Sequence, residues 1–209
     1  MSASPDTTDR VRRHYDKSAS RYDREIKFFE RVLFGDGRRW VCSQATGNVL
    51  EIAIGTGRNL RYYPRGVRLT AIELSPAMLD LARAEATALG LEADLRVGDA
   101  QALEFPDDCF DTVTCTLSLC TIPDDRAAVA EMRRVLRPGG RVRLLEHVRS
   151  PMTAVRALER MLEPLFLRLE HDHLTREPLE HLQAEGFVID DVQRSKLGIV
   201  ERAAAHKPG

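Results

Sequence analysis

The sequence lacks any long apolar run. No stretch of its 209 residues approaches the 18 or so consecutive apolar residues of a membrane-spanning helix, so no integral membrane segment is expected. The first thirty residues also lack the short apolar segment of a secretory signal peptide. We therefore expect a protein that is not exported and that has a cytoplasmic localisation.

An excess of charge and a paired arrangement of cysteines are also missing. Thirty-one basic and 32 acidic residues give a net charge of −1 at pH 7, which leaves no basic field to hold a phosphate backbone. Nucleic acid is therefore not an expected partner. The four cysteines form no CxxC pair and no zinc-finger spacing, which argues against a disulfide framework or structural metal and agrees with a reducing cytosol. The oligomeric state is left open.

Short strand-like runs alternate with helical periods from residue 48 onwards. This alternation predicts an α/β fold, a Rossmann-like, doubly wound and mostly parallel seven-stranded sheet with an N-terminal helical arm. The expected strands lie within residues 48–54, 68–74, 93–99, 110–117, 141–147, 187–192 and 197–205.

We expect one domain, residues 1–209, made of three parts. The helical arm occupies residues 1–47, a cofactor-binding core occupies 48–150, and residues 151–209 supply substrate-side helices and the last strands. Helices are predicted from Ser75-Pro76 to Gly90, from about Asp124 to Leu136, and near 152–169 and 175–185.

The most informative stretch is VLEIAIGTGRN, residues 49–59. A strand leads into a turn with two glycines, Gly55 and Gly57, which lets the backbone approach a ligand closely. Taken alone, this stretch also fits an ordinary tight turn between a strand and a helix. However, Glu73 ends the second strand and Asp99 ends the third, where an open α/β sheet presents side chains to a nucleoside.

The charge of Glu51 helps to decide which nucleotide is expected. A carboxylate beside the turn repels a pyrophosphate, yet it suits a ligand that carries an ammonium and a sulfonium, as S-adenosylmethionine (SAM) does. The dinucleotide fingerprint also requires glycine or alanine where this chain has Leu60. A nicotinamide-dependent oxidoreductase stays an alternative, although Glu51 and Leu60 both argue against a dinucleotide.

Several segments together resemble the class I SAM-dependent methyltransferases of the ubiquinone/menaquinone-biosynthesis-like group, over about residues 10 to 190. The resemblance implies SAM as cofactor and S-adenosylhomocysteine as product. The family usually has glycine where this chain has Ala53, and we expect binding to survive that difference. The matching segments are YDKSASRYD (15–23), EIAIGTGRN (51–59), AIELSPAMLDLA (71–82), GDAQALEFPDDCFDTVTCTLSLCTIPD (98–124) and RRVLRPGGRVRLLEH (133–147).

The resemblance also assigns cofactor-binding residues. Tyr15 and Tyr22 of the arm are expected to close over the cofactor, although two aromatic residues seven apart also fit one face of a packed helix. The others are Glu51, Ala53, Gly55, Gly57 and Asn59 around the methionine moiety, Glu73 at the ribose, Leu74, Asp99 and Ala100 at the adenine, and Thr116 and Leu117 near the methyl group.

A narrower similarity concerns the acceptor. EHVRSP (146–151) and HLTREPLEHLQAEGF (173–187) are similar to bacterial phospholipid or small-molecule methyltransferases and to the methyltransferase-like 7 proteins, whose N-terminal membrane anchor we do not find here. This similarity implies a small-molecule acceptor, with a thiol as the first candidate. O-, N- or C-methylation of a quinol, phenol or aminophospholipid stays open, as does a SAM-binding catalyst that transfers no methyl group.

Methyl transfer from a sulfonium is an in-line displacement, so it requires no metal and no catalytic cysteine. His147, directly after the fifth strand, is the candidate catalytic base and a candidate acceptor contact. His173 and Phe28 are further candidate acceptor contacts. His171-Asp172-His173 contains residue types that bind metals. However, two histidines this close in sequence need a further ligand, and nothing in the sequence fixes one beside them, so we expect no metal site.

Overall fold

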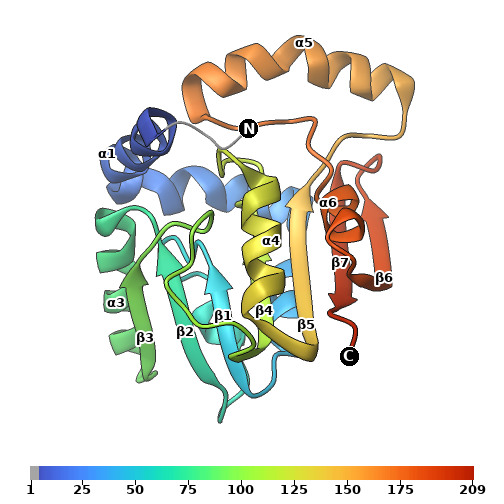
Figure 1. Cartoon of the computed structure of the whole chain (residues 1–209). Coiled ribbons are helices and arrows are strands. Elements are labelled where there is room, and N and C mark those ends of the chain that lie inside the picture. The colour runs from blue at the N-terminus through green and yellow to red at the C-terminus, as the bar shows by residue number, and fades with distance from the viewer. Residues whose placement is uncertain (1–4) are drawn as a thin grey trace.

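A computed structural model describes residues 5–209 of the chain. The predicted arm is helical over its described part: α1 (Pro5–Phe29) continues into the short wide helix η1 (Glu30–Phe34), and α2 (Gly37–Cys42) follows. Residues 1–4 of the predicted arm lie outside the described residues. Figure 1 shows that this arm runs over one end of the central sheet.

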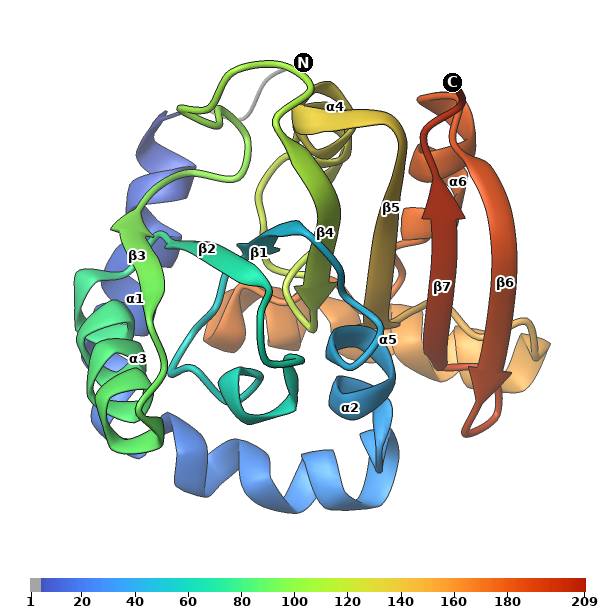
Figure 2. The same cartoon turned by 90° about the horizontal axis from the view of Figure 1, so that it is seen from below.

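The sheet has seven strands in the order β3-β2-β1-β4-β5-β7-β6. Strands β1 to β5 are parallel to one another, whereas β7 runs antiparallel to both β5 and β6. The predicted doubly wound, mostly parallel sheet is therefore confirmed (Figures 1 and 2). The strands are β1 (Asn48–Ile52), β2 (Arg68–Glu73), β3 (Ala93–Val97), β4 (Phe110–Thr116), β5 (Leu136–His147), β6 (Val188–Ser195) and β7 (Val200–His206).

The two predicted core helices have the expected capping residues. In α3 (Pro76–Leu89) the Ser75 hydroxyl accepts a hydrogen bond from the Met78 N–H, and Gly90 ends the helix in the left-handed conformation. In α4 (Asp125–Val135) the Asp124 carboxylate accepts from the Ala127 N–H. The expected helix end at Leu136 is the first residue of β5, because the Leu136 backbone already pairs with Phe110.

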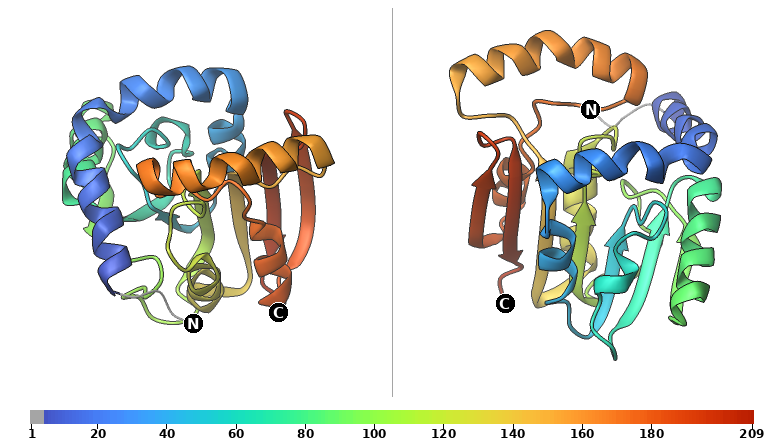
Figure 3. Two further views of the ribbon diagram at one scale, coloured as in Figure 1. Left: turned by 90° about the horizontal axis from the view of Figure 1, so that it is seen from above. Right: turned by 180° about the vertical axis from the view of Figure 1, so that it is seen from behind.

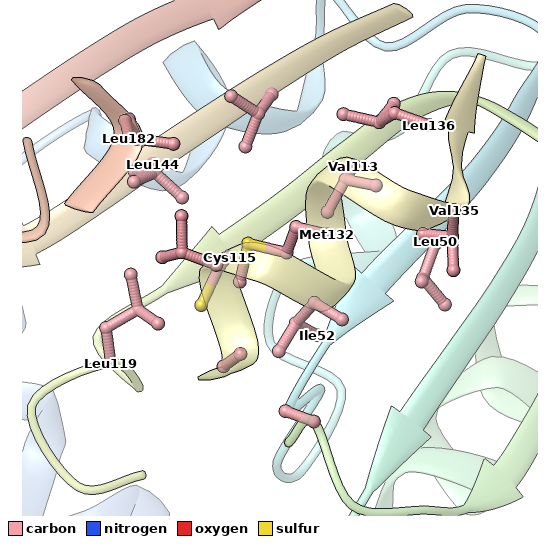
Figure 4. Packing of buried hydrophobic residues seen from close by; sticks show 14 of the residues in the cluster. Leu50, Ile52, Val113, Cys115, Leu119, Met132, Val135, Leu136, Leu144 and Leu182 are labelled. Atoms are coloured by element: carbon pink, nitrogen blue, oxygen red, sulfur yellow. The ribbon is translucent and has the colours of Figure 1, made fainter. Parts of the chain in front are cut away.

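Alternate strand residues pack against helices on the two faces of the sheet. Leu50 and Ile52 of β1 pack with Met132 of α4, as Figure 4 shows, whereas Val49 packs with Leu79 of α3. This alternation follows from the two-residue period of a strand. Both faces are therefore covered beneath the carboxyl ends of β1, β2 and β4, which leaves that edge for a ligand.

Three further helices complete the fold. They are η2 (Leu60–Tyr62), α5 (Thr153–Glu170) and α6 (Pro178–Ala184), and the last two match the helices predicted near 152–169 and 175–185. Figures 1 and 3 show α5 lying across the carboxyl edge of the sheet, beyond the ends of β4 and β5. None of the helices in residues 5–209 is long and apolar enough to cross a bilayer.

Candidate active site

One pocket lies at the carboxyl ends of the parallel strands, with α1 forming part of its wall. It gathers residues from the arm, from the loops that follow β1, β2 and β3, and from the end of β4. Ten predicted cofactor residues line it: Tyr15, Tyr22, Ala53, Gly55, Glu73, Leu74, Asp99, Ala100, Thr116 and Leu117. Segments far apart in the sequence therefore meet where a nucleoside was expected.

Glu73, the last residue of β2, connects two loops of this pocket. One carboxylate oxygen accepts a hydrogen bond from the Gly55 N–H and the other from the Ser75 N–H, each at 2.9 Å. Burial raises the pKa of this carboxyl, and those two backbone bonds oppose the rise. Glu73 thus holds the loop after β1 against the loop after β2, with its carboxylate in the pocket wall.

Two non-glycine residues of the pocket have the left-handed backbone conformation that favours glycine. Ala53 has φ of 52° and Leu117 has φ of 54°. Such a conformation costs an L-residue on the order of 1 kcal/mol or more. The strained backbone therefore lies in the pocket wall, directly after the ends of β1 and β4.

Three predicted cofactor residues do not line the pocket, which corrects their placement. Glu51 lies on the same face of β1 as Val49, so the strand alternation turns its side chain into the protein instead of towards the ligand. Its carboxylate accepts bonds from Asn59 Nδ2 at 2.6 Å and from the Tyr63 hydroxyl at 3.0 Å. Gly57 lies where a side chain would meet Leu60 and Ala82, so it serves packing.

Burial raises the pKa of Glu51 to about 7 from 4.5, although bonds from Asn59 and Tyr63 oppose the rise. Between these pH values the folded protein keeps a proton that the unfolded chain has released. The contribution of Glu51 to stability is therefore complete below about pH 4.5 and declines, by up to about 3 kcal/mol, as the pH rises to about 7.

A Glu51→Gln variant has no such proton to lose. Its free energy of unfolding relative to the unmodified protein is expected to increase from about pH 5 to about pH 7 and to stay level above that. Urea unfolding of both proteins across this range measures the difference. Glu104→Gln, at an exposed position, is the control and should show a constant difference. A constant difference for Glu51→Gln as well contradicts the raised pKa.

Two aspartates fix the arm over the pocket. Asp16 Oδ1 accepts hydrogen bonds from the Ser75 hydroxyl at 2.6 Å and from the Ala77 N–H at 3.3 Å, at the start of α3. Asp23 accepts from the Thr56 hydroxyl at 2.7 Å. These contacts place Tyr15 and Tyr22 in the pocket wall with their ring centroids 6.2 Å apart. Both aspartates belong to the YDKSASRYD segment, but their contacts were not predicted.

Sequence reasoning also missed several polar residues of the pocket, among them Arg38 and Gln101. Arg38 forms an ion pair with Glu30 and donates a hydrogen bond to Thr116 Oγ1 at 3.1 Å. Gln101 donates from Nε2 to Asp99 at 2.9 Å, and its carbonyl oxygen accepts from the Asp124 N–H. No local motif marks Arg38, whereas the position of Gln101 two residues after Asp99 was a usable signal.

The three candidate acceptor residues do not line the pocket either. Phe28 is 69% exposed on α1 and its ring contacts that of Phe29, which corrects its expected position. The His147 imidazole lies 2.8 Å from Asp172 Oδ1. His173 is partly exposed, and its N–H donates to the Cys120 carbonyl at 3.0 Å. Both histidines therefore lie next to Cys120, in the loop that follows β4, and outside the pocket lining.

His147 belongs to a small polar cluster with Cys120 and Asp172. Their potential ligand atoms lie within 4.8 Å of one another, and no other group of this kind occurs in residues 5–209. Burial lowers the pKa of His147, but the hydrogen bond and negative charge of Asp172 outweigh it, so the pKa is raised overall. The cluster is already hydrogen-bonded, and the expectation that no metal binds stays a prediction.

Arg176 holds the loop between β4 and α4, which forms the other side of the pocket. Its guanidinium donates to three backbone carbonyls, those of Leu119, Ile122 and Pro123. It also lies 3.6 Å from Asp125 at the start of α4. The segment after α5 thus fixes the backbone of a loop whose own residues Leu117, Ser118 and Thr121 face the pocket.

The parallel sheet, the glycine loop and the acids at two strand ends define a nucleoside-binding α/β protein. Residues 50–144 match the family model described as "Methyltransferase domain". A demethylmenaquinone methyltransferase of Thermus thermophilus is 35% identical over 151 residues, 67% of this chain and 67% of that protein. The chain therefore belongs to the class I SAM-dependent methyltransferases.

Other relatives act on different acceptors. A phosphatidylethanolamine N-methyltransferase of Cereibacter sphaeroides is 40% identical over 114 residues, 52% of this chain and 56% of that protein. A thiol S-methyltransferase of Rattus norvegicus is 33% identical over 144 residues, 66% of this chain and 59% of that protein. The matched part of the chain spans less than two thirds of the length of these two relatives.

Solved structures share the fold. A SAM-dependent methyltransferase of Methanosarcina mazei gives a TM-score of 0.63 at 24% identity and covers 79% of this chain and 94% of its own. The cyclase SpnF gives a TM-score of 0.68 at 20% identity and covers 83% and 79%. Because the fold carries both a methyltransferase and a cyclase, these similarities concern the fold alone.

Proposed function

We propose that this protein transfers a methyl group from SAM to a small-molecule thiol. The observation that carries the proposal is the pocket at the carboxyl edge of the sheet, which gathers ten of the thirteen predicted cofactor residues. Its wall has the parts that such a ligand requires: carboxylates of Glu73 and Asp99 for the hydroxyl and amino groups of adenosine, and the rings of Tyr15 and Tyr22 for the apolar parts.

When bound, SAM supplies an electrophilic methyl group, and its transfer leaves S-adenosylhomocysteine. The chain's own residues have to orient the ligand and exclude water, because the acceptor sulfur provides the electron pair for the new bond. Glu73 and Asp99 fix one end of the ligand. Thr116 and Leu117, at the end of β4, lie at the other end, where the acceptor has to approach.

A thiol acceptor agrees with the state of His147. This imidazole does not line the pocket and is hydrogen-bonded to Asp172, so it is not placed to take a proton from an acceptor there. A thiol ionises near neutral pH and scarcely needs a base, whereas a phenol does. The similarity to a thiol S-methyltransferase supports the same choice. We also propose a cytoplasmic setting, because the spacing of the four cysteines suggests no disulfide framework.

The test is transfer of an isotope-labelled methyl group from SAM to a pooled panel of alkyl thiols, phenols, quinols, amines and aminophospholipids, read by mass spectrometry. We expect a labelled thioether and an equal amount of S-adenosylhomocysteine. If a quinol or phospholipid is labelled instead, the methyltransferase activity is confirmed but the thiol is not the acceptor. Calorimetric SAM binding without any labelled product contradicts the proposal and favours a SAM-binding catalyst that transfers no methyl group.

A further inference from the structure

Helix α5 exposes a continuous row of large apolar side chains. None of its eighteen residues is buried. Leu158, Met161, Leu165 and Leu169 follow one another at spacings of three and four residues, which places them on one face of the helix. Their exposed fractions lie between 50 and 69%. We call these four residues the outer stripe.

Two of the three acidic residues of α5, Glu159 and Glu163, face the protein. Glu159 accepts hydrogen bonds from the Ser150 N–H at 3.0 and 3.2 Å, and Glu163 accepts from the Thr175 hydroxyl at 2.8 and 2.9 Å. Glu170, at the end of the helix, lies 3.3 Å from His14 of the arm. The inner side of α5 therefore carries two carboxylates beside the partly buried Val155, Leu162 and Leu167, whereas an ordinary surface helix turns its charged residues to water.

The basic residues of α5 have no acidic partner. Arg156, Arg160 and Arg168 form no ion pair within residues 5–209, and the last two are exposed. The side of α5 that meets the surroundings therefore combines an apolar stripe with unpaired positive charge. A helix of this kind is typical of one that lies in the interface of an anionic bilayer.

We propose that α5 docks on an anionic lipid surface, with the outer stripe in the interface and Arg160 and Arg168 against the lipid phosphates. A second copy of the chain is a weaker candidate for this face, because a symmetric contact brings the same unpaired arginines of two copies together. Because it carries charged residues along its whole length, α5 lies on such a surface instead of crossing it.

Docking through α5 places the pocket beside the lipid surface. Helix α5 lies over the carboxyl edge of the sheet, the edge that carries the pocket (Figures 1 and 3). The segment that follows α5 contains Arg176, which holds the loop lining the pocket. Docking through α5 depends on the surface of the protein alone, so it does not depend on which atom of the acceptor receives the methyl group.

Co-sedimentation of the full chain with vesicles tests the proposal. We expect binding to vesicles of phosphatidylcholine and phosphatidylglycerol in equal parts, and weaker binding to phosphatidylcholine alone. Met161→Glu puts a negative charge into the outer stripe and should weaken binding to the anionic vesicles about tenfold or more. Arg160→Gln with Arg168→Gln should weaken it about twenty-five-fold, since each basic residue near an anionic surface contributes about fivefold.

Leu81→Glu is the matched control, because Leu81 is an exposed leucine on α3, away from α5. It should bind the anionic vesicles as the unmodified protein does, and all variants should keep the same thermal midpoint. No binding to the anionic vesicles, equal binding to both vesicle types, or equal binding of Met161→Glu and Leu81→Glu each overturns the proposal. Sedimentation equilibrium that gives a dimer, converted to monomer by Met161→Glu, assigns the face to self-association and also overturns it.

Discussion

Glu73→Ala is expected to weaken SAM binding about a hundredfold or more. The carboxylate occupies the pocket wall and is the predicted partner of the ribose hydroxyls, and hydrogen bonds to a charged group contribute about 1.5 to 3 kcal/mol each. The variant also leaves the N–H groups of Gly55 and Ser75 without their acceptor, so it should lose about 1 to 3 kcal/mol of stability. Calorimetric titration with SAM and urea unfolding measure the two effects.

Glu73→Gln separates binding from folding, because glutamine keeps the shape and one acceptor oxygen but removes the charge. We expect it to stay closer to the unmodified protein in stability while still binding SAM more weakly. Asp80→Ala, on the exposed side of α3, is the control and should change neither property. Unchanged SAM affinity in both Glu73 variants would place the ribose elsewhere and remove the main support for the proposed cofactor site.

Arg176→Ala is expected to destabilise the protein by about 3 to 5 kcal/mol. It removes a charged donor from three backbone carbonyls of a largely enclosed loop, and it leaves Asp125 without its guanidinium. Because that loop forms one side of the pocket, we also expect a higher KM. Urea unfolding and steady-state kinetics at saturating SAM measure the two changes.

Arg126→Ala is the matched control for this variant. Arg126 is 68% exposed and only approaches Glu185, at 3.9 Å, so its removal should cost less than about 1 kcal/mol. The loss of stability in Arg176→Lys should lie between those of Arg126→Ala and Arg176→Ala, since a single ammonium cannot reach three carbonyls at once. If Arg176→Ala unfolds at the same urea concentration as Arg126→Ala, the loop is held by other contacts.

Local signals in the sequence were sufficient to predict which residues follow the ends of the parallel strands. The β-branched runs, the Ser75-Pro76 capping pair and the glycine turn are short-range features, and parallel strands bring their carboxyl ends to one edge. Glu73 and Asp99 could therefore be placed together although 26 residues separate them in the sequence. The placement of Glu73 and Asp99 follows from these rules, whereas the other cofactor residues of the pocket were expected from the resemblance to the methyltransferase family.

The rest of the site depends on contacts between distant segments, which no local pattern encodes. Arg38 reaches Thr116 across 78 residues, and Arg176 reaches Leu119 across 57. The side of α1 that carries Phe28 depends on how the arm docks, through Asp16 and Asp23. A helix with apolar residues on more than one side gives no such answer by itself.

The contact of Arg176 with main-chain oxygens has a consequence for evolution. Backbone carbonyls are present whatever the side chain, so the hold on the loop between β4 and α4 makes no demand on the identity of Leu117, Ser118 or Thr121. Substitutions at these three positions can reshape the pocket wall while the loop keeps its path. A lineage built on this arrangement can drift from one acceptor to another without first losing its fold.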